Sequence, residues 1–345
     1  MRSRTLLTFL LALAATTLVA RTPATSASAA DSATLPQDMR AVRLHGKGGP
    51  EALRLERVPL PQAADDQVLI RVRAAGVNPI DWKLRERGAR SGQPRILGFD
   101  AAGTIVAMGA DVKGWKAGDE VMALTSPSGG GAYAEFVVAY ARDIARKPKS
   151  LSFDEAAGVP TVGSTVWTYL VLNAGDLKGK RILIQGGAGG VGSVAVQIAK
   201  ARGAHVLATA SGRNHEYLRS IGVDEPIDYT KLRFEDAARD VDIVFDTVGG
   251  DTLQRSYAVV KRGGMLISIV NAVSARECDS RGISCPPEAS GSGAHEALAA
   301  IGELAEARRF RINVDRVFPL KEAAQAQELN KAGHTRGKVI LRVAE

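Results

Sequence analysis

Residues 181–192 read RILIQGGAGGVG, an apolar run that leads into a glycine-rich turn. The aliphatic and β-branched side chains at the start of this stretch predict a buried strand over 181–185. After the turn, the sequence from Val191 to Arg202 predicts a helix. A strand, a tight turn and a helix in this order are typical of a βαβ unit with a parallel sheet.

The glycines of this turn have the spacing of a dinucleotide-binding loop. Gly187, Gly189 and Gly192 fit the pattern G-x-G-x-x-G, and we count Gly190 and Val191 with the same loop. Glycine permits the tight turn, lets the main chain approach a pyrophosphate and allows the helix to pack closely on the strand. The start of the helix offers free N–H groups and a partial positive charge to phosphate. The alternative is a glycine-rich turn that only joins a strand to a helix.

The end of the next predicted strand, 205–210, helps to distinguish NAD from NADP. NAD sites usually carry Asp or Glu there, where the carboxylate binds the ribose 2′-hydroxyl. This chain has SGRN at 211–214, without an acid. A carboxylate would repel a 2′-phosphate, whereas the guanidinium of Arg213 can hold one through paired hydrogen bonds. We therefore predict NADP(H), with Ser211 and Arg213 in its site; the alternative for Arg213 is a solvated residue at a helix start.

The composition is ordinary for a soluble globular protein and excludes few functions. The chain has 345 residues, of which 45% are hydrophobic and 24% charged, and this length predicts two domains. The net charge of +8 is not concentrated in any stretch, and residues 1–30 contribute three arginines and no acid to it. No basic stripe alternates with aromatic residues, so a nucleic-acid partner is not expected.

The first 30 residues have the three parts of a secretory signal peptide. A basic start (MRSR) is followed by an apolar stretch over 6–20 and by small residues over 26–30 that suit cleavage. The apolar stretch is too short and wrongly flanked for a confident membrane span, so we expect none in the mature chain. This predicts an exported, periplasmic or secreted protein. The alternatives are an uncleaved anchor and a cytoplasmic protein that starts at Met39.

The sequence pattern of the rest of the chain changes near Asp154. Residues 40–150 alternate short β-like runs with glycine turns, show no long helical period, and predict a β-rich domain with a partly closed sheet. From Asp154 onward, alternating helices and strands predict a parallel, doubly wound sheet, so that the fold class is α/β. The predicted elements are helices at 154–158, 164–174 and 295–307, strands at 181–185, 205–210, 242–246 and 265–270, a loop at 273–294, and a tail of strand 313–318, helix 320–329 and strand 338–343.

Only two cysteines are present, Cys278 and Cys285. In an oxidising compartment the pair could close a small loop, and in a reducing one the two would remain thiols. They lack the partners of a zinc site.

Five motifs, in this order, make the chain resemble the medium-chain dehydrogenase/reductase superfamily. They are AGVNPIDWK at 75–83, LGFDAAG at 97–103, GDEV at 118–121, GGVG at 189–192 and GHTRGKVIL at 333–341. Within the superfamily they resemble the zinc-independent quinone oxidoreductases and enone reductases. The resemblance runs from Met39 to the C-terminus. It implies a GroES-like catalytic domain over 39–157, completed by 308–345, with a Rossmann NADP-binding domain over 158–307.

The positions of the zinc ligands in other members of this superfamily carry different residues here. Asn78 stands where they have the first cysteine, Phe99 and Asp100 where histidine and glutamate follow a glycine, and Thr161 where they have the second cysteine. A tetrahedral zinc site needs thiolate or imidazole ligands at such positions. The resemblance therefore implies no metal, and a hydride transfer from NADPH to a quinone or to the C=C of an α,β-unsaturated carbonyl compound.

The resemblance also suggests four candidate catalytic residues. Asn78 is expected to contact the substrate carbonyl or the nicotinamide, with a turn residue as the alternative. Asp81 and Lys83 are expected to orient one another and their loop, or else to form a surface ion pair. Thr161, together with Thr165 as a cofactor contact, is expected to line the nicotinamide pocket, with helix capping as the alternative.

Three further residues are predicted cofactor contacts. Tyr229 matches a tyrosine that relatives place near the adenosine phosphate, and its alternative is an ordinary half-buried aromatic residue. Arg336 lies in the C-terminal motif that approaches the cofactor, and its alternative is a solvated charge in a turn. Val248, shortly after the strand predicted at 242–246, is counted with the cofactor site. No residue is identified as a general acid.

The expected partner is a small quinone or enone substrate. A homodimer is possible, but residues 276–294 replace a more apolar strand that often supports dimers in this branch. The alternative to an enzyme is a non-catalytic NADPH-binding protein with a regulatory or RNA-contacting role on the same fold.

Overall fold

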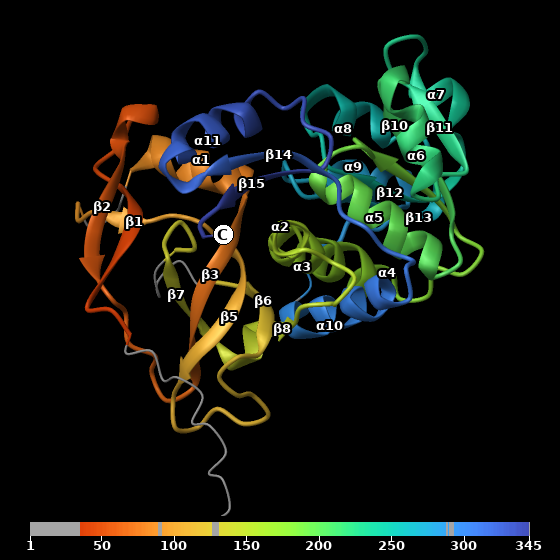
Figure 1. The fold of residues 1–345 in the computed structure, drawn as a ribbon. Coiled ribbons are helices and arrows are strands. Elements are labelled where there is room, and N and C mark those ends of the chain that lie inside the picture. The colour runs from red at the N-terminus through yellow and green to blue at the C-terminus, as the bar shows by residue number, and fades with distance from the viewer. Residues whose placement is uncertain (1–34, 89–91, 126–130, 288, 290–292, 345) are drawn as a thin grey trace, which may run out of the picture. The chain divides into compact units, whose positions relative to one another are not determined.

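Two large sheets and one small sheet carry the fold of the described chain (Figure 1). The computed structural model describes residues 35–344 apart from 89–91, 126–130, 288 and 290–292. The predicted signal peptide over residues 1–30 lies outside the described residues. Residues from Gln37 onward form one compact unit.

The first sheet is GroES-like and mostly antiparallel. Its strands follow the order β14-β15-β3-β5-β6-β8, with β7 beside β3, and a smaller sheet has the order β2-β1-β4. The predicted β-rich domain is therefore confirmed. The bounds are β1 Asp38–Leu44, β2 Leu53–Pro59, β3 Gln67–Val77, β4 Arg95–Ile96, β5 Asp100–Met108, β6 Glu120–Leu124, β7 Phe136–Tyr140, β8 Ile144–Arg146, β14 Val314–Pro319 and β15 Lys338–Arg342.

The C-terminal strand β15 joins this first sheet. It pairs antiparallel with β3, with Val339 opposite Val77, and parallel with β14. Figure 1 shows the blue strands from the end of the chain beside the orange strand β3. Because Asn78 directly follows β3 and Lys338 begins β15, this register brings residues that are 260 positions apart into contact.

The second sheet is parallel and Rossmann-like, which confirms the predicted α/β fold class. Its strands follow the order β11-β10-β9-β12-β13. They are β9 Arg181–Gln185, β10 His205–Ala210, β11 Glu225–Asp228, β12 Val241–Asp246 and β13 Val260–Ser268. The helices are α1 Pro79–Arg87, α2 Phe153–Ala157, α3 Pro160–Val166, α4 Leu172–Ala174, α5 Gly190–Ala201, α6 His215–Ser220, α7 Phe234–Ala237, α8 Gly250–Ser256, α9 Ala275–Arg281, α10 Gly293–Glu306 and α11 Ala323–Lys331, with a π-helical turn at Trp167–Val171.

The predicted strands 181–185 and 205–210 have the bounds observed for β9 and β10. Apart from Arg181 and His205 at their starts, the residues of these strands are buried, because helices cover both faces of a parallel sheet. Strand β11 was missed. It is four residues long, contains Pro226 and lies at the edge of the sheet, so it has neither the length nor the apolar run of its neighbours.

Helix α1 lies within residues 40–150, where the sequence shows no long helical period, and it was not predicted. Its apolar residues form no stripe, and the helix buries the polar side chains Asp81 and Arg85 instead. The local signals were nevertheless present in the sequence: Pro79 occupies the first turn, and Asp81 accepts a hydrogen bond from the main-chain N–H of Asn78.

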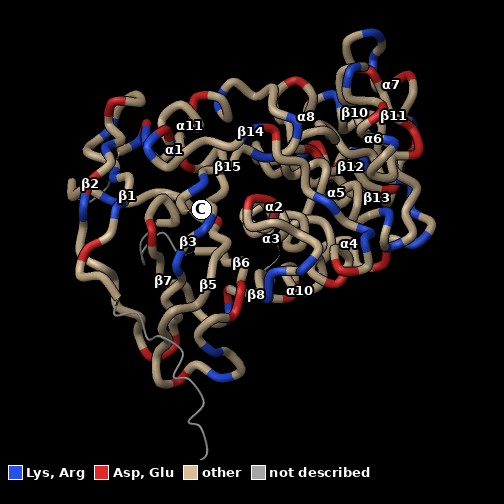
Figure 2. Tube along the Cα trace, in the orientation of Figure 1, with Lys and Arg blue, Asp and Glu red and all other residues tan. Residues whose placement is uncertain are grey.

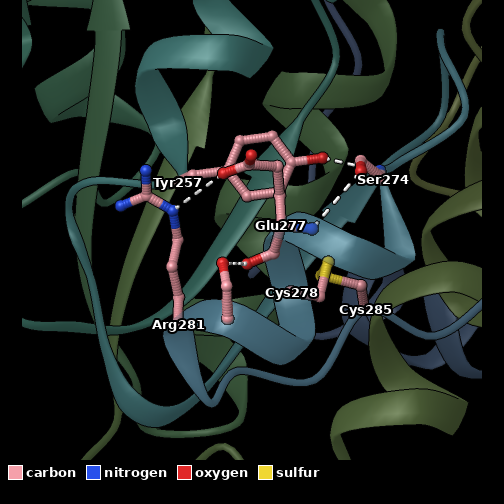
Figure 3. Close-up of a disulfide and its surroundings, with 7 residues drawn as sticks. Tyr257, Ser274, Glu277, Cys278, Arg281 and Cys285 are labelled. Carbon is pink, nitrogen blue, oxygen red and sulfur yellow. Dashed lines mark hydrogen bonds and ion pairs between the residues drawn. A yellow bond between two sulfur atoms is a disulfide. The ribbon is translucent and has the colours of Figure 1, made fainter.

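Helix α9 likewise lies inside the predicted loop 273–294. The Ser274 hydroxyl caps it by accepting from the Glu277 N–H, and Gly282 ends it with a positive φ of 63°. Cys278 and Cys285 form a disulfide that ties α9 to the segment after it (Figure 3). That segment lies along β13: Ser284 donates to the Gly264 carbonyl at 2.8 Å and accepts from the Leu266 N–H at 2.9 Å.

Asp81 is fully buried and joins the start of α1 to a distant turn. One carboxylate oxygen accepts from the Asn78 N–H at 2.8 Å and the other from the Gly98 N–H at 3.0 Å. Burial raises the pKa of Asp81 to about 7. The prediction that Asp81 and Lys83 orient one another is wrong. Lys83 points to the exposed surface, with its Nζ 5.6 Å from the Trp82 ring centroid, because residues two apart on a helix face different directions.

The raised pKa of Asp81 predicts a pH-dependent stability. The folded chain binds more protons than the unfolded chain between about pH 4 and pH 7, so the free energy of unfolding falls as pH rises through this window. In Asp81→Asn this titration is absent. We expect the fall between pH 5 and pH 8 to be smaller in the variant by roughly 2–3 kcal/mol, measured by urea unfolding. The substitution also removes a hydrogen bond, which lowers the free energy of unfolding of the variant equally at pH 5 and pH 8. An equal fall between these pH values in the wild type and the variant would therefore contradict the prediction.

Candidate functional site

A cavity of about 980 Å³ lies where the glycine-rich turn meets the first sheet. Its walls come from the start of α1, from α3, from the start of α5, and from the loops before β5, after β13 and before β15. Predicted site residues that line it are Asn78, Lys83, Thr161, Thr165, Gly189, Gly190 and Val191. Much of the remaining wall is apolar, for example Ile80, Phe99, Leu124, Val162 and Ile269.

The glycine turn has the geometry of a phosphate cradle. A Cβ atom at Gly187 would lie 2.6 Å from the Cβ of Ala208, and one at Gly192 would lie 2.2 Å from the Gly186 carbonyl oxygen. These two glycines therefore let the helix and turn pack closely on the sheet. At Gly189 an added Cβ would meet only the Gly186 oxygen, at 3.5 Å, and this residue faces the cavity. The first N–H groups of α5 have no partners within the helix, so the turn fits a pyrophosphate.

The loop before β15 runs alongside this turn. The Gly337 N–H donates to the Ala188 carbonyl at 3.0 Å, and Gly189 and Gly337 form a parallel bridge. Thr335, Gly337 and Lys338 consequently line the same cavity as the glycine turn.

A second cavity, of about 340 Å³, collects three arginines. Arg213 comes from the segment after β10, whereas Arg311 and Arg336 come from the C-terminal part of the chain. The Arg336 guanidinium lies 5.6 Å from the ring centroid of Tyr217, and Arg311 donates to the Ser220 hydroxyl. The Glu216 carboxylate also borders this cavity, so its charged groups are three guanidiniums and one carboxylate.

Gln197 of α5 fixes the main chain of Arg311. Its side-chain oxygen accepts from the Arg311 N–H at 2.9 Å, and its side-chain nitrogen donates to the Arg311 carbonyl at 2.9 Å. Arg311 was not among the predicted site residues, because it lies outside every motif and is brought to Arg213 by the return of the C-terminal segment.

Five predicted cofactor residues line neither cavity: Gly187 and Gly192, which pack the turn against the sheet, and Ser211, Tyr229 and Val248. Ser211 accepts a hydrogen bond from the Asn214 side chain at 3.2 Å, Tyr229 is 59% exposed, and Val248 is 49% exposed. Tyr229 is thus not a half-buried aromatic residue, which was the alternative to a cofactor contact. It also does not line either cavity. The cofactor contacts of Ser211, Tyr229 and Val248 stay predictions.

A carboxylate lies beside the turn at 211–214 despite its acid-free sequence. Asp228 ends the unpredicted strand β11, and a Cβ at Gly212 would lie 2.5 Å from its carboxylate. The Thr230 hydroxyl donates to Asp228 at 2.6 Å and the Thr230 N–H at 3.0 Å, and these hydrogen bonds lower the pKa of the carboxyl group. This acid is therefore already engaged by its own loop.

A buried polar network forms the wall of the large cavity behind the glycine turn. Asp100 accepts from the Asn78 side-chain amide at 2.9 Å and from the Thr161 N–H at 2.7 Å. The Lys338 ammonium donates to the Asn78 side-chain oxygen and lies 3.4 Å from the Asp100 carboxylate. Asn78, Asp100 and Lys338 are all less than 4% exposed.

This network brings together three positions that hold zinc ligands in other members of the superfamily. The groups that meet here are an amide, a carboxylate, a hydroxyl and an ammonium, which do not make a tetrahedral zinc site. Within the described residues, no group of three or more His, Cys, Asp or Glu side chains is arranged to hold a metal ion. Lys338 was not among the predicted site residues, although it stands in the C-terminal motif.

Charge on the described surface is mixed in sign. Figure 2 shows lysine and arginine positions interspersed with aspartate and glutamate along the chain. None of the helices described in the structure is long and apolar enough to cross a membrane.

Comparison with known proteins agrees with this geometry. The family "Alcohol dehydrogenase GroES-like domain" matches residues 64–149, and "Zinc-binding dehydrogenase" matches residues 221–341. The 2-methylene-furan-3-one reductase of Solanum lycopersicum is 40% identical over 266 residues, 74% of this chain and 68% of the relative. The chloroplastic NADPH-dependent alkenal/one oxidoreductase of Arabidopsis thaliana is 36% identical over 323 residues, 90% of this chain and 81% of the relative.

A solved structure extends the comparison to three dimensions. The quinone oxidoreductase from Coxiella burnetii superposes with a TM-score of 0.80 at 35% identity, covering 89% of this chain and all of that one. These similarities span both sheets and the cavity between the glycine turn and α1. The chain belongs to the medium-chain dehydrogenase/reductase superfamily, among its quinone and enone oxidoreductases.

Proposed function

We propose that this protein is an NADPH-dependent oxidoreductase that delivers hydride to a quinone or to the C=C of an α,β-unsaturated carbonyl compound. The observation that carries the proposal is the single cavity shared by the glycine turn and the residues Asn78 and Thr161. A cofactor on the turn and a substrate beside α1 would therefore meet in one space. The names of the relatives, an alkenal/one oxidoreductase and a quinone oxidoreductase, support the same reaction.

The cofactor contacts follow from the two cavities. Gly189, Gly190 and Val191 would hold the pyrophosphate at the start of α5. Arg213, Arg311 and Arg336 would hold the 2′-phosphate, since guanidinium groups bind phosphate through paired hydrogen bonds. Thr165 would line the nicotinamide pocket, and Ser211, Tyr229 and Val248 are proposed as further contacts. When bound, NADPH supplies the hydride.

The protein's own contribution is to position, desolvate and polarise the substrate. With cofactor and substrate bound, the apolar walls of the large cavity would help to displace water, which strengthens the remaining polar interactions. Thr161 and Asn78 are proposed to orient the carbonyl end, and exposed Lys83 lies at the cavity lining beside them. Asp81 acts as a positioning residue, because it holds Asn78 and the turn before Phe99 without lining the cavity.

The proposed domain limits reflect the return of the C-terminal segment to the first sheet. We assign 39–157 and 308–345 to the GroES-like domain and 158–307 to the Rossmann domain, supported by the pairing of β15 with β3. The single proposed reaction needs both domains, because each contributes to both cavities.

Turnover by the purified protein tests the proposed reaction. We expect it to consume NADPH with an enone or a quinone, measured as the loss of reduced-nicotinamide absorbance. We expect it not to reduce NADP+ with simple alcohols, measured as the absence of a gain in the same absorbance. A chelator should not change the rate, because the side chains at the superfamily's ligand positions do not suit zinc. Tight NADPH binding without turnover of any acceptor would instead favour the non-catalytic alternative.

Arg311 provides a test of the cofactor preference. In Arg311→Gln we expect the KM for NADPH to rise about 10- to 100-fold, since a charge-assisted hydrogen bond contributes roughly 1.5–3 kcal/mol. The KM for NADH should stay unchanged, because NADH lacks the 2′-phosphate. Arg309→Gln, two residues away and outside the cavity, is the matched control. Equal effects on both cofactors would argue against a 2′-phosphate site here.

We also propose export, which the pairing of the only two cysteines supports, because disulfides persist mainly in oxidising compartments. N-terminal sequencing of the native protein checks this. A start near Ala30 or Asp31 is expected, and a start at Met39 would contradict export.

A further inference from the structure

Lys338 carries a buried charge in the lining of the large cavity. It is 3% exposed, begins strand β15 and follows directly after Gly337, which bridges the glycine turn. Two buried charges are costly to desolvate, and well-packed apolar side chains in place of both Lys338 and Asp100 would often be at least as stable. Stability alone therefore gives little reason for a charged pair at this position.

The aliphatic part of the Lys338 side chain, called its stem below, packs beneath the glycine turn. A Cβ at Gly190 would lie 3.1 Å from the Lys338 Cδ, and a Cβ at Gly158 would lie 3.3 Å from its Cγ. The aliphatic part of the side chain thus runs between the first residue of α5 and the end of α2. It supports the turn from behind.

The ammonium group reaches the opposite wall of the cavity. It donates to the Asn78 side-chain oxygen and to the Val77 carbonyl, the latter at 3.3 Å, and lies 3.4 Å from the Asp100 carboxylate. Asp100 already receives hydrogen bonds from the Asn78 amide at 2.9 Å and from the Thr161 N–H at 2.7 Å. Asp100 therefore has other donors besides Lys338. The contact that depends on Lys338 is the hydrogen bond to the Asn78 side-chain oxygen.

These contacts fix the orientation of one amide group. The oxygen of the Asn78 side chain faces the ammonium, and its nitrogen faces Asp100 and, at 3.4 Å, the Thr161 hydroxyl. Without the ammonium, the amide oxygen would lose this charged donor. Polar groups that are oriented in advance stabilise developing charge best in a site that excludes water, and small misplacements are expensive in rate.

We propose that Lys338 is a positioning residue that links the glycine turn to the carbonyl-binding wall. Its stem supports the turn, and its charge fixes Asn78 and, through Asp100, Thr161. This inference rests on the proposed function for its effect on rate. Its effect on the Asn78 amide does not depend on the reaction.

Two substitutions separate the stem from the charge. Lys338→Met keeps the stem and removes the donors; we expect kcat to fall about 10- to 100-fold. The Kd for NADPH, followed by the fluorescence of the bound nicotinamide, should stay within about threefold. Lys338→Ala also removes the support beneath Gly190, so that NADPH binding should weaken as well. Lys321→Met, at an exposed position, is the control for the same chemical change.

A structural readout makes the test independent of turnover. In the wild-type protein the side-chain amide protons of Asn78 should exchange slowly with solvent, measured by NMR, and in Lys338→Met they should exchange at least about tenfold faster. Unchanged kcat or unchanged exchange in Lys338→Met would overturn the inference. A parallel loss of kcat, NADPH affinity and thermal stability would also overturn it, because that pattern indicates a purely structural role.

If Lys338→Met does not fold, Asn78→Leu tests the same link from the other side. This variant keeps the lysine and should lose a similar factor in kcat, whereas an unchanged kcat would overturn the inference. If both variants fold, the double variant should be no slower than Asn78→Leu, because the two residues act as one unit. A wild-type protein that turns over neither enones nor quinones would refute the proposed function alone. The amide exchange would still decide the role of Lys338.

Discussion

The antiparallel pairing of β15 with β3 is the constraint on which both candidate binding regions depend. It fixes Val339 opposite Val77, and therefore sets Lys338 against Asn78 and Gly337 against the glycine turn. The same return of the chain carries Arg311 and Arg336 to Arg213. A slip of one residue in this register would turn the Lys338 side chain to the other face of the sheet, since side chains alternate along a strand. The large cavity would then lose its buried lysine charge.

The two regions use charge in opposite ways. The arginine cavity has exposed guanidiniums from three separate segments, which suits a mobile, highly charged group that arrives from water. In the network around Asp100, an ammonium, an amide, a carboxylate and the half-buried Thr161 hydroxyl largely satisfy one another. Buried polar groups of this kind hold their geometry only when each has a partner, which explains why the network is concentrated at one wall of an otherwise apolar cavity.

Much of this arrangement could be predicted from the sequence, and the failures have physical causes. Strands β9 and β10 were predicted at their observed bounds, because long apolar runs in a parallel sheet leave a strong signal. Helices α1 and α9 were missed because their signals lie in capping residues and not in apolar periodicity. Asp228 was missed together with its short edge strand. Arg311 and Lys338 became visible only through tertiary pairing, which local patterns do not encode.

The disulfide-tied segment after α9 has a consequence for contacts between molecules. The edge of a sheet normally offers unpaired N–H and C=O groups to another chain. At β13 the Gly264 carbonyl and the Leu266 N–H are already bonded to Ser284 of the same molecule. A second copy cannot extend the sheet there by the same hydrogen bonds unless it first displaces this segment. The Cys278–Cys285 disulfide therefore helps to protect this edge against strand exchange and aggregation. The protection depends on the redox state of the surroundings, because a reducing environment would break the disulfide.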